Sequence, residues 1–162
     1  MLMSFAVDGF AFAAESLTGK YIGAKNKKML HRSIKYAFSW GWILAALAAV
    51  VYWVAYDDLL YLFTDNEEVV AAATPYLYWV ILMPLLSIGA FMWDGIYVGA
   101  TASVAMRNTM MAATFLFYLP AYYVLQPYIG NHALWLALCI FMVARTLLQT
   151  ALAKRHIYDL LD

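Results

Sequence analysis

Four charged side chains lie inside long apolar stretches of the sequence, where they could bind or move an ion. They are three carboxylates and one guanidinium, namely Asp8, Glu15, Asp94 and Arg145. A charged side chain at the centre of a membrane helix costs about 2.5–3.5 kcal/mol on insertion scales, so such residues usually face a bundle interior or a watery cavity. Carboxylates there can take up a proton or a metal cation. We therefore treat the three acids as candidate ion-coupling residues and Arg145 as their charge partner.

The spacing of the acids predicts their depth in a membrane. Asp8 lies 12 residues before Lys20, and Asp94 lies 13 residues before Arg107. At a rise of 1.5 Å per residue, both acids would lie about 18–20 Å from the same boundary, near the bilayer midplane. Glu15 follows Asp8 by seven residues, close to two helical turns, so these two carboxylates are expected on one helix face. We favour Asp94 and Asp8 as coupling residues, because Glu15 lies closer to the boundary.

Two functional interpretations of these charges remain open at this point. In the first, Arg145 pairs with an acid and the charges hold helices together, as in a structural or assembly membrane protein. In the second, at least one acid binds an ion during a transport cycle. Three acids and one base leave at least two acids without an obvious basic partner, and this surplus favours the second interpretation.

Composition indicates a polytopic membrane protein. Of the 162 residues, 66% are hydrophobic and 12% are charged, against about 45–50% and about 25% in soluble proteins. The formal net charge is zero, so no overall field attracts nucleic acid. The single cysteine, Cys139, excludes an intrachain disulfide and a cysteine-based metal cluster. We find no phosphate-binding loop or nucleophile elbow, and we expect neither an enzyme nor a resident cofactor.

The charged residues divide the chain into helical spans. Between Lys35 and Asp57 lie 21 residues without an acid or a base, and 25 lie between Glu68 and Asp94. A hydrocarbon core of about 30 Å needs about 20 helical residues. The predicted fold class is therefore an all-α membrane protein with a bundle of about five transmembrane helices. The expected spans are residues 1–22, 36–56, 70–98, 109–125 and 133–152.

Prolines and a polar stretch are expected to interrupt these spans. The start of the third span, around Pro75, is expected at the interface, and Pro84 and Pro120 are expected to kink the third and fourth spans. Residues 126–132 have the composition of a turn and are expected to join the last two spans.

Basic residues predict the orientation of the chain. With five alternating crossings, nine of the ten bases fall in loops or ends on one side. The positive-inside rule makes that side cytoplasmic. We therefore predict a multi-pass protein of the cell (inner) membrane, embedded in the lipid bilayer, with residues 20–35 and the C-terminus facing the cytoplasm.

A short pattern, F-x-x-D-G, occurs twice and includes two of the intramembrane acids. It covers residues 5–9 and 91–95, with Asp8 and Asp94 at the acidic position. A glycine next to the acid allows a neighbouring helix to approach closely, or allows the helix to bend.

The segments that contain these acids resemble a known family, the multidrug and toxic compound extrusion (MATE) transporters. Residues 8–24 (DGFAFAAESLTGKYIGA) look like the eighth helix of these proteins, closest to their DNA-damage-inducible branch. Residues 91–101 (FMWDGIYVGAT), followed by residues 106–108, resemble that branch's tenth helix and the loop after it. Residues 62–65 (LFTD) resemble the external segment before that helix.

The resemblance implies a function and roles for particular residues. Family members have twelve helices in two facing six-helix lobes, and they export cationic or amphipathic compounds in exchange for protons or sodium ions. Asp94 matches an acid that belongs to a cation site in some members, so Na⁺ at Asp94 is the one metal expected. Asp8 and Glu15 match acids that are typical of the branch. The candidate residues of the substrate cavity are Phe91, Met92, Met106 and Met110.

The resemblance places this chain at helices 8–12, within a C-terminal lobe. We therefore expect a fragment, with the missing N-terminal lobe as its partner and no drug export without it. A lipid-linked sugar flippase of the wider superfamily is an alternative, but its cavity should be much more cationic than a single Arg145 allows.

Overall fold

A computed structural model of the chain gives its fold. It describes the backbone of residues 2–56 and 60–161 and the side chains of residues 9–56 and 60–160. Every element in this part of the chain is helical, which confirms the predicted all-α fold class.

The described residues form seven α-helices, together with short 3-10 and π segments. The α-helices are α1 (Leu2–Gly23), α2 (Lys27–Val54), α3 (Glu67–Ala73), α4 (Leu77–Gly99), α5 (Ser103–Ala113), α6 (Leu119–Ile129) and α7 (His132–Ala153). A 3-10 turn (Thr74–Tyr76) joins α3 to α4, and a π segment (Thr114–Tyr118) joins α5 to α6. A second π segment (Lys154–Tyr158) and a 3-10 turn (Asp159–Leu161) follow α7.

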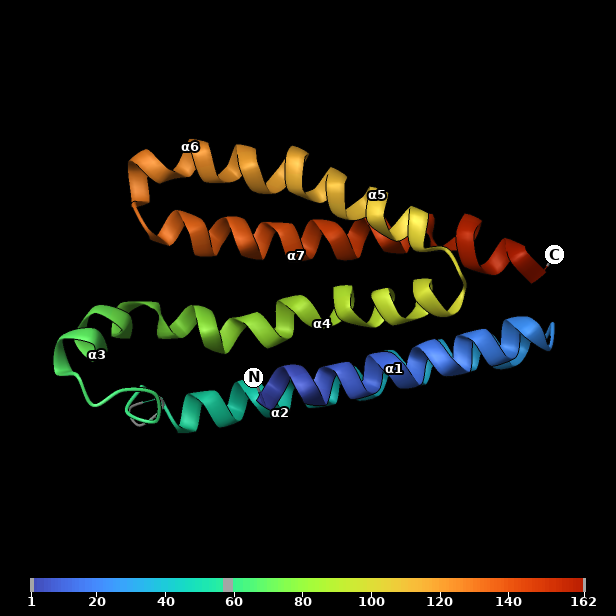
Figure 1. Cartoon of the computed structure of the whole chain (residues 1–162), viewed down its shortest axis with the longest axis horizontal. Coiled ribbons are helices and arrows are strands. Elements are labelled where there is room, and N and C mark those ends of the chain that lie inside the picture. The colour runs from blue at the N-terminus through green and yellow to red at the C-terminus, as the bar shows by residue number, and fades with distance from the viewer. Residues whose placement is uncertain (1, 57–59, 162) are drawn as a thin grey trace.

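Helix α4 forms the centre of the bundle. The hairpin of α1 and α2 packs on one side of α4 and α7 packs on the other, while α5 and α6 pack on the far side of α7. These long helices run side by side along the bundle (Figure 1). The main buried cluster joins α4 to its neighbours through Leu30, Ile96, Tyr97, Ala153 and Ile157. Helix α4 therefore contacts the α1–α2 hairpin on one side and α7 on the other.

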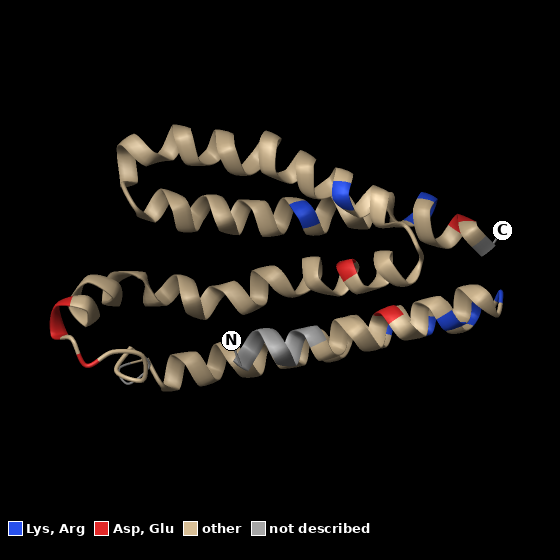
Figure 2. Ribbon diagram, viewed as in Figure 1, with Lys and Arg blue, Asp and Glu red and all other residues tan. Residues whose placement is uncertain are grey.

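Three helical segments among the described residues are long and apolar enough to cross a membrane. They are Lys27–Val54, Glu67–Gly99 and His132–Tyr158. The basic residues gather toward the end of the bundle that holds the α1–α2 turn and the C-terminus (Figure 2). The acidic residues before and at the start of α3 lie at the opposite end. This separation agrees with the prediction that most basic residues lie in turns and ends on one side of the membrane.

Two of the turns at the basic end have the same backbone form. Each follows a Gly-Ala pair and contains a residue in the left-handed region, Lys25 (φ 51°) and Thr101 (φ 57°). In both turns the next N–H donates to a carbonyl oxygen five residues earlier, at 2.9 and 2.8 Å. This bond is typical of a Schellman helix end. It reverses the chain within three residues, which holds α1 against α2 and α4 against α5.

Two helices extend beyond their predicted spans. Helix α2 begins at Lys27 instead of residue 36, because Asn26 caps it: its Oδ1 accepts from the Met29 N–H at 3.0 Å. The basic segment is therefore mostly helical, and the connection is a tight turn. Helix α6 continues through Pro127 to Ile129, so the predicted turn over 126–132 is confined to its last residues. Gly130 (φ 56°) provides the left-handed residue that ends the helix.

The prolines act in different ways. The predicted third span is divided at the 3-10 turn containing Pro75, which separates α3 from α4. Helix α4 continues through Pro84. The π segment ends two residues before Pro120, and the missing N–H of a proline is a common reason for such a change of hydrogen-bond register.

Candidate functional site

An ion pair between α4 and α7 lies at the centre of the candidate site. The Nη2 of Arg145 donates to Oδ2 of Asp94, and the two side chains are 7% and 23% exposed. One turn further along α7, Gln149 Nε2 donates to Asp94 Oδ1 at 2.9 Å. Both carboxylate oxygens of Asp94 are therefore held by a pair of α7 side chains spaced four residues apart, on one helix face.

Two further hydrogen bonds fix α4 against α7 around this pair. The Tyr97 hydroxyl donates to the backbone carbonyl of Gln149 at 2.7 Å. The indole N–H of Trp93 donates to the Thr150 hydroxyl at 2.8 Å. Both aromatic residues are buried. The position of Asp94 is therefore set by its neighbours on both sides along α4.

Two buried polar atoms of the site have no hydrogen-bond partner among the described residues. They are Nε of Arg145 and Oε1 of Gln149. The Arg145 guanidinium carbon also lies 5.9 Å from the centroid of the Phe141 ring, within the range of a cation–π contact. Unpartnered buried atoms of this kind often bind water or an ion. An amide oxygen next to a carboxylate also suits a hard cation.

A cavity of about 310 Å³ opens beside the ion pair, between α1, α4, α5 and α7. Its size lies within the range of about 300–1,000 Å³ for small-molecule sites. Three charged residues line it: Glu15, Asp94 and Arg145. The rest of the wall is largely apolar and consists of Ala11, Phe12, Phe91, Gly95, Val98, Met106 and Met110. The arrangement can hold a small amphipathic or cationic molecule next to carboxylates.

The three predicted acids have different places in this arrangement. Asp94 is ion-paired, as described above. Glu15 is half-buried at the same cavity, and within the described part of the chain no hydrogen bond or ion pair holds its carboxylate. The Asp8 side chain lies outside the described residues. The structure therefore brings Glu15, Asp94 and Arg145 together.

Three of the four residues expected in the substrate cavity line the cavity beside the ion pair. Phe91, Met106 and Met110 line the cavity. Met92 does not line this cavity, because its side chain is fully buried and packs against Ala45 of α2 and Ile88 of α4. One residue along a helix turns the side-chain direction by about 100°, which separates Met92 from its neighbour Phe91.

Close packing of backbones places Glu15 near Asp94. A Cβ atom added to Gly95 would lie 2.9 Å from the carbonyl carbon of Ala11, and one added to Gly99 would lie 3.0 Å from that of Glu15. The two glycines form a G-x-x-x-G pattern on α4, typical of closely packed membrane helices. The expected close approach beside Asp94 is therefore confirmed, whereas an added Cβ on Gly9 would meet nothing within 4 Å.

Comparison with known proteins identifies the family. The family model named MatE matches residues 1–124 of the chain. The chain belongs to the MatE family. It is 35% identical over 153 residues to DNA damage-inducible protein F of Escherichia coli (strain K12), covering 94% of this chain and 33% of that protein.

A solved structure agrees with this assignment at the level of the fold. The MatE chain superposes on the crystal structure of the eukaryotic MATE transporter AtDTX14 with a TM-score of 0.86 and 16% sequence identity. The match covers 96% of this chain and 35% of the other. The chain thus spans about a third of the length of these two proteins, and its all-helical fold agrees with the corresponding portion of the solved structure, as the sequence predicted.

Sequence reasoning missed two residues of this MatE site. Gln149 carries no charge, so a search for ionisable residues passed over it, although its spacing of four from Arg145 was a usable signal. Gly99 was not recognised as part of the G-x-x-x-G pattern that includes Gly95. Among the described residues, no group of three or more His, Cys, Asp or Glu side chains is arranged to hold a metal ion.

Proposed function

We propose that this MatE chain forms part of a secondary active efflux transporter, which exchanges cationic or amphipathic compounds for protons or sodium ions. The observation that carries the proposal is the pair of carboxylates, Glu15 and Asp94, on the wall of a largely apolar cavity between four helices. With Arg145 counted, the ionised site has one negative charge in excess. In a medium of low dielectric constant, such an excess attracts a cation.

A cationic compound and the coupling ion would compete for the same carboxylates. An amphipathic cation can place its charge near Glu15 and its apolar part against Phe91, Met106 and Met110. Neutralising Glu15 with a proton, or occupying it with Na⁺, removes that attraction and favours release of the compound. Competition of this kind couples uptake of the ion to export of the compound.

The ion pair suggests different roles for the two acids. Neutralising Asp94 in this arrangement would leave the buried Arg145 without its counter-charge, and breaking such a pair costs about 3–5 kcal/mol. Glu15 has no such partner among the described residues. We therefore propose Glu15 as the carboxylate that accepts the ion first, which reverses our initial preference. Asp94 would respond when α7 moves relative to α4.

The complete transport cycle would need more helices than this chain contains. The MatE relatives are about three times as long, and we propose that an opposing lobe closes the cavity and rocks against this one. The basic turn between α1 and α2 and the C-terminus would face the cytoplasm, in agreement with the positive-inside rule.

A second candidate function is a structural role, and the Asp94–Arg145 pair favours it. In that case the two charges would stabilise the contact between α4 and α7 and would take no part in ion exchange. Glu15 distinguishes the two proposals. It contributes no ion pair in the described part of the chain, so a purely structural role of the charges gives its carboxylate no function, whereas ion exchange does.

Transport in liposomes tests the proposal. A full-length MatE protein carrying Glu15→Gln or Asp94→Asn, in the numbering of this chain, should lose efflux of a fluorescent cation driven by a proton or sodium gradient. Asp65→Asn, in the exposed segment before α3, is the matched control and should leave efflux unchanged. Normal gradient-driven efflux with an unchanged coupling ratio in both site variants would contradict the proposal and favour the structural role.

A further inference from the structure

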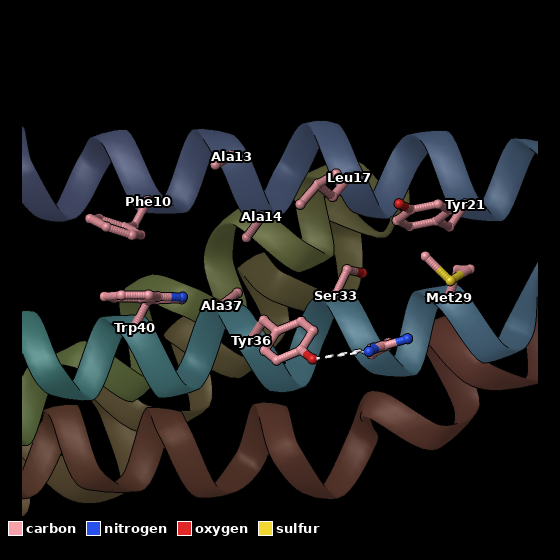
Figure 3. A pocket seen from close by; sticks show the side chains of 11 residues that line it. Phe10, Ala13, Ala14, Leu17, Tyr21, Met29, Ser33, Tyr36, Ala37 and Trp40 are labelled. Carbon is pink, nitrogen blue, oxygen red and sulfur yellow. Dashed lines mark hydrogen bonds between the residues drawn. The ribbon is translucent and has the colours of Figure 1, made fainter.

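A second cavity, separate from the site described above, lies between α1 and α2. Its volume is about 410 Å³. It is lined by Phe10, Ala13, Ala14, Leu17, Tyr21, Met29, Arg32, Ser33, Tyr36, Ala37 and Trp40 (Figure 3). Apart from Arg32 and Ser33, these side chains are apolar or aromatic. We call this cavity the α1–α2 groove.

The groove runs along the helices for the depth of one membrane leaflet. Figure 3 places Phe10 and Trp40 at one end of it and Tyr21 and Met29 at the other. Tyr21 lies eleven positions after Phe10, which at a rise of 1.5 Å per residue corresponds to about 16 Å along the helix. Half of a hydrocarbon core of about 30 Å is about 15 Å. The length of the groove therefore matches one leaflet.

The end of the groove near Tyr21 and Met29 is strongly basic. Six Lys and Arg residues lie in positions 20–35, all of them exposed, and the sequence has no acid between Glu15 and Asp57. Lys and Arg near an anionic membrane surface contribute about 1 kcal/mol each to attraction. This end of the groove is therefore suited to an anionic group at the membrane surface.

Arg32 is held at this end by Tyr36. Its Nε and Nη2 both donate to the Tyr36 hydroxyl at 3.3 Å, and its guanidinium carbon lies 5.6 Å from the centroid of the Tyr36 ring. Figure 3 shows this bond beside the groove. Within the described residues Nη1 makes no hydrogen bond, so part of the guanidinium fork is available for a phosphate, which arginine binds well.

The volume of the groove distinguishes between possible occupants. A helix about 10 Å in diameter and about 16 Å long would occupy roughly 1,250 Å³, about three times the volume of the groove. An extended hydrocarbon chain, about 4–4.5 Å across at van der Waals contact, would occupy roughly 200–250 Å³ over the same length. The groove is therefore large enough to take in an acyl chain, whereas a whole helix would not fit inside it.

We propose that the α1–α2 groove binds an anionic phospholipid, with one acyl chain between the helices and its phosphate against Arg32 and the neighbouring lysines. The lipid would come from the leaflet at the basic end of the bundle. This inference does not depend on the transport function, because it concerns the opposite face of α1 from the ion pair and uses none of its residues.

Photolabelling of the purified chain in nanodiscs tests the proposal. The probe is phosphatidylglycerol with a diazirine in one acyl chain, and the labelled peptides are identified by mass spectrometry. Label is expected on the groove segments 10–21 and 29–40. Unlabelled phosphatidylglycerol should compete for these positions at least fivefold better than phosphatidylcholine.

Two substitutions with matched controls sharpen the test. Arg32→Gln should lower labelling of the groove about fivefold, the equivalent of about 1 kcal/mol, whereas Arg107→Gln, an exposed arginine elsewhere, should not change it. Ala13→Phe should fill the groove and block labelling, whereas Ala46→Phe, on an exposed position of α2, should not. Circular dichroism shows whether each variant is folded. If Arg32→Gln does not fold, Ala13→Phe still tests the proposal.

Three results would overturn the proposal. Equal competition by phosphatidylcholine would show that the groove does not select an anionic headgroup. Labelling of the exposed α6 residues Tyr123 and Val124 to the same extent as the groove would indicate bulk lipid only. A lipid-independent crosslink between two chains carrying Ala13→Cys would identify a second copy as the occupant.

Discussion

The contact between α1 and α4 gives a prediction that can be worked from the structure in detail. Replacing Gly95 with alanine would place a Cβ atom 2.9 Å from the carbonyl carbon of Ala11, and closer still to its oxygen. Carbon atoms in contact lie about 3.5–4.0 Å apart, so the helices would have to separate by at least about 0.6 Å. Because both sides of the contact are backbone, no flexible side chain can move aside to relieve the clash.

The net effect on stability combines two opposing terms. Overpacking costs about 1–3 kcal/mol, and the upper end applies here because the clash is with backbone. Alanine in place of glycine within a helix returns about 1 kcal/mol. We therefore expect Gly95→Ala to lower the free energy of unfolding by about 2 kcal/mol. Gly9→Ala meets nothing within 4 Å and should raise the free energy of unfolding by up to about 1 kcal/mol.

The assay is reversible unfolding of the purified chain in mixed micelles, followed by circular dichroism during titration with a denaturing detergent. The two alanine variants carry the same chemical change on packed and unpacked faces, so the difference between them, about 3 kcal/mol, isolates the helix contact. Equal unfolding midpoints for Gly95→Ala and Gly9→Ala would refute the close approach of α1 to α4.

Three further predictions concern the ion pair and the turns. Arg145→Leu should destabilise the chain by about 3–5 kcal/mol, and adding Asp94→Leu should restore most of this loss; strictly additive effects in the same unfolding assay would argue against the pair. Gln149→Leu should cost about 1–3 kcal/mol, because it leaves a carboxylate oxygen of Asp94 without a donor, and an unchanged midpoint would argue against this hydrogen bond. Thr101→Gly should raise the free energy of unfolding by about 1 kcal/mol, because glycine adopts φ 57° without strain. A lower free energy of unfolding for this variant would contradict the prediction.

The helical framework was predictable because the membrane imposes it. In lipid, backbone groups must bond within a helix, so long stretches free of charge, such as residues 36–56, indicate helices without any knowledge of packing. Helix ends were less predictable, since they depend on single caps. The Asn26 cap starts α2 well before its apolar stretch begins. The sequence shows a run of lysines here, but it does not show that one capping side chain is enough to start the helix before that run.

The candidate site was only partly predictable, because it depends on which helix faces meet. The residue types pointed to Asp94 and Arg145, yet 51 positions separate them and no local pattern specifies that α4 and α7 are neighbours. The same limit explains Met92. It was expected beside Phe91 in the cavity because of its residue type, although its side chain packs toward α2. The glycines Gly95 and Gly99 now explain how α1 comes close enough to add Glu15 to the same cavity.

The central proposal is that the carboxylates of the cavity exchange a coupling ion for a cationic compound. Its most direct test is to count the protons or sodium ions released when a cationic dye binds to the full-length MatE protein in detergent. We predict about one ion released per dye bound, and none in the variant carrying both Glu15→Gln and Asp94→Asn. Unchanged ion release and unchanged dye affinity in that variant would contradict the account.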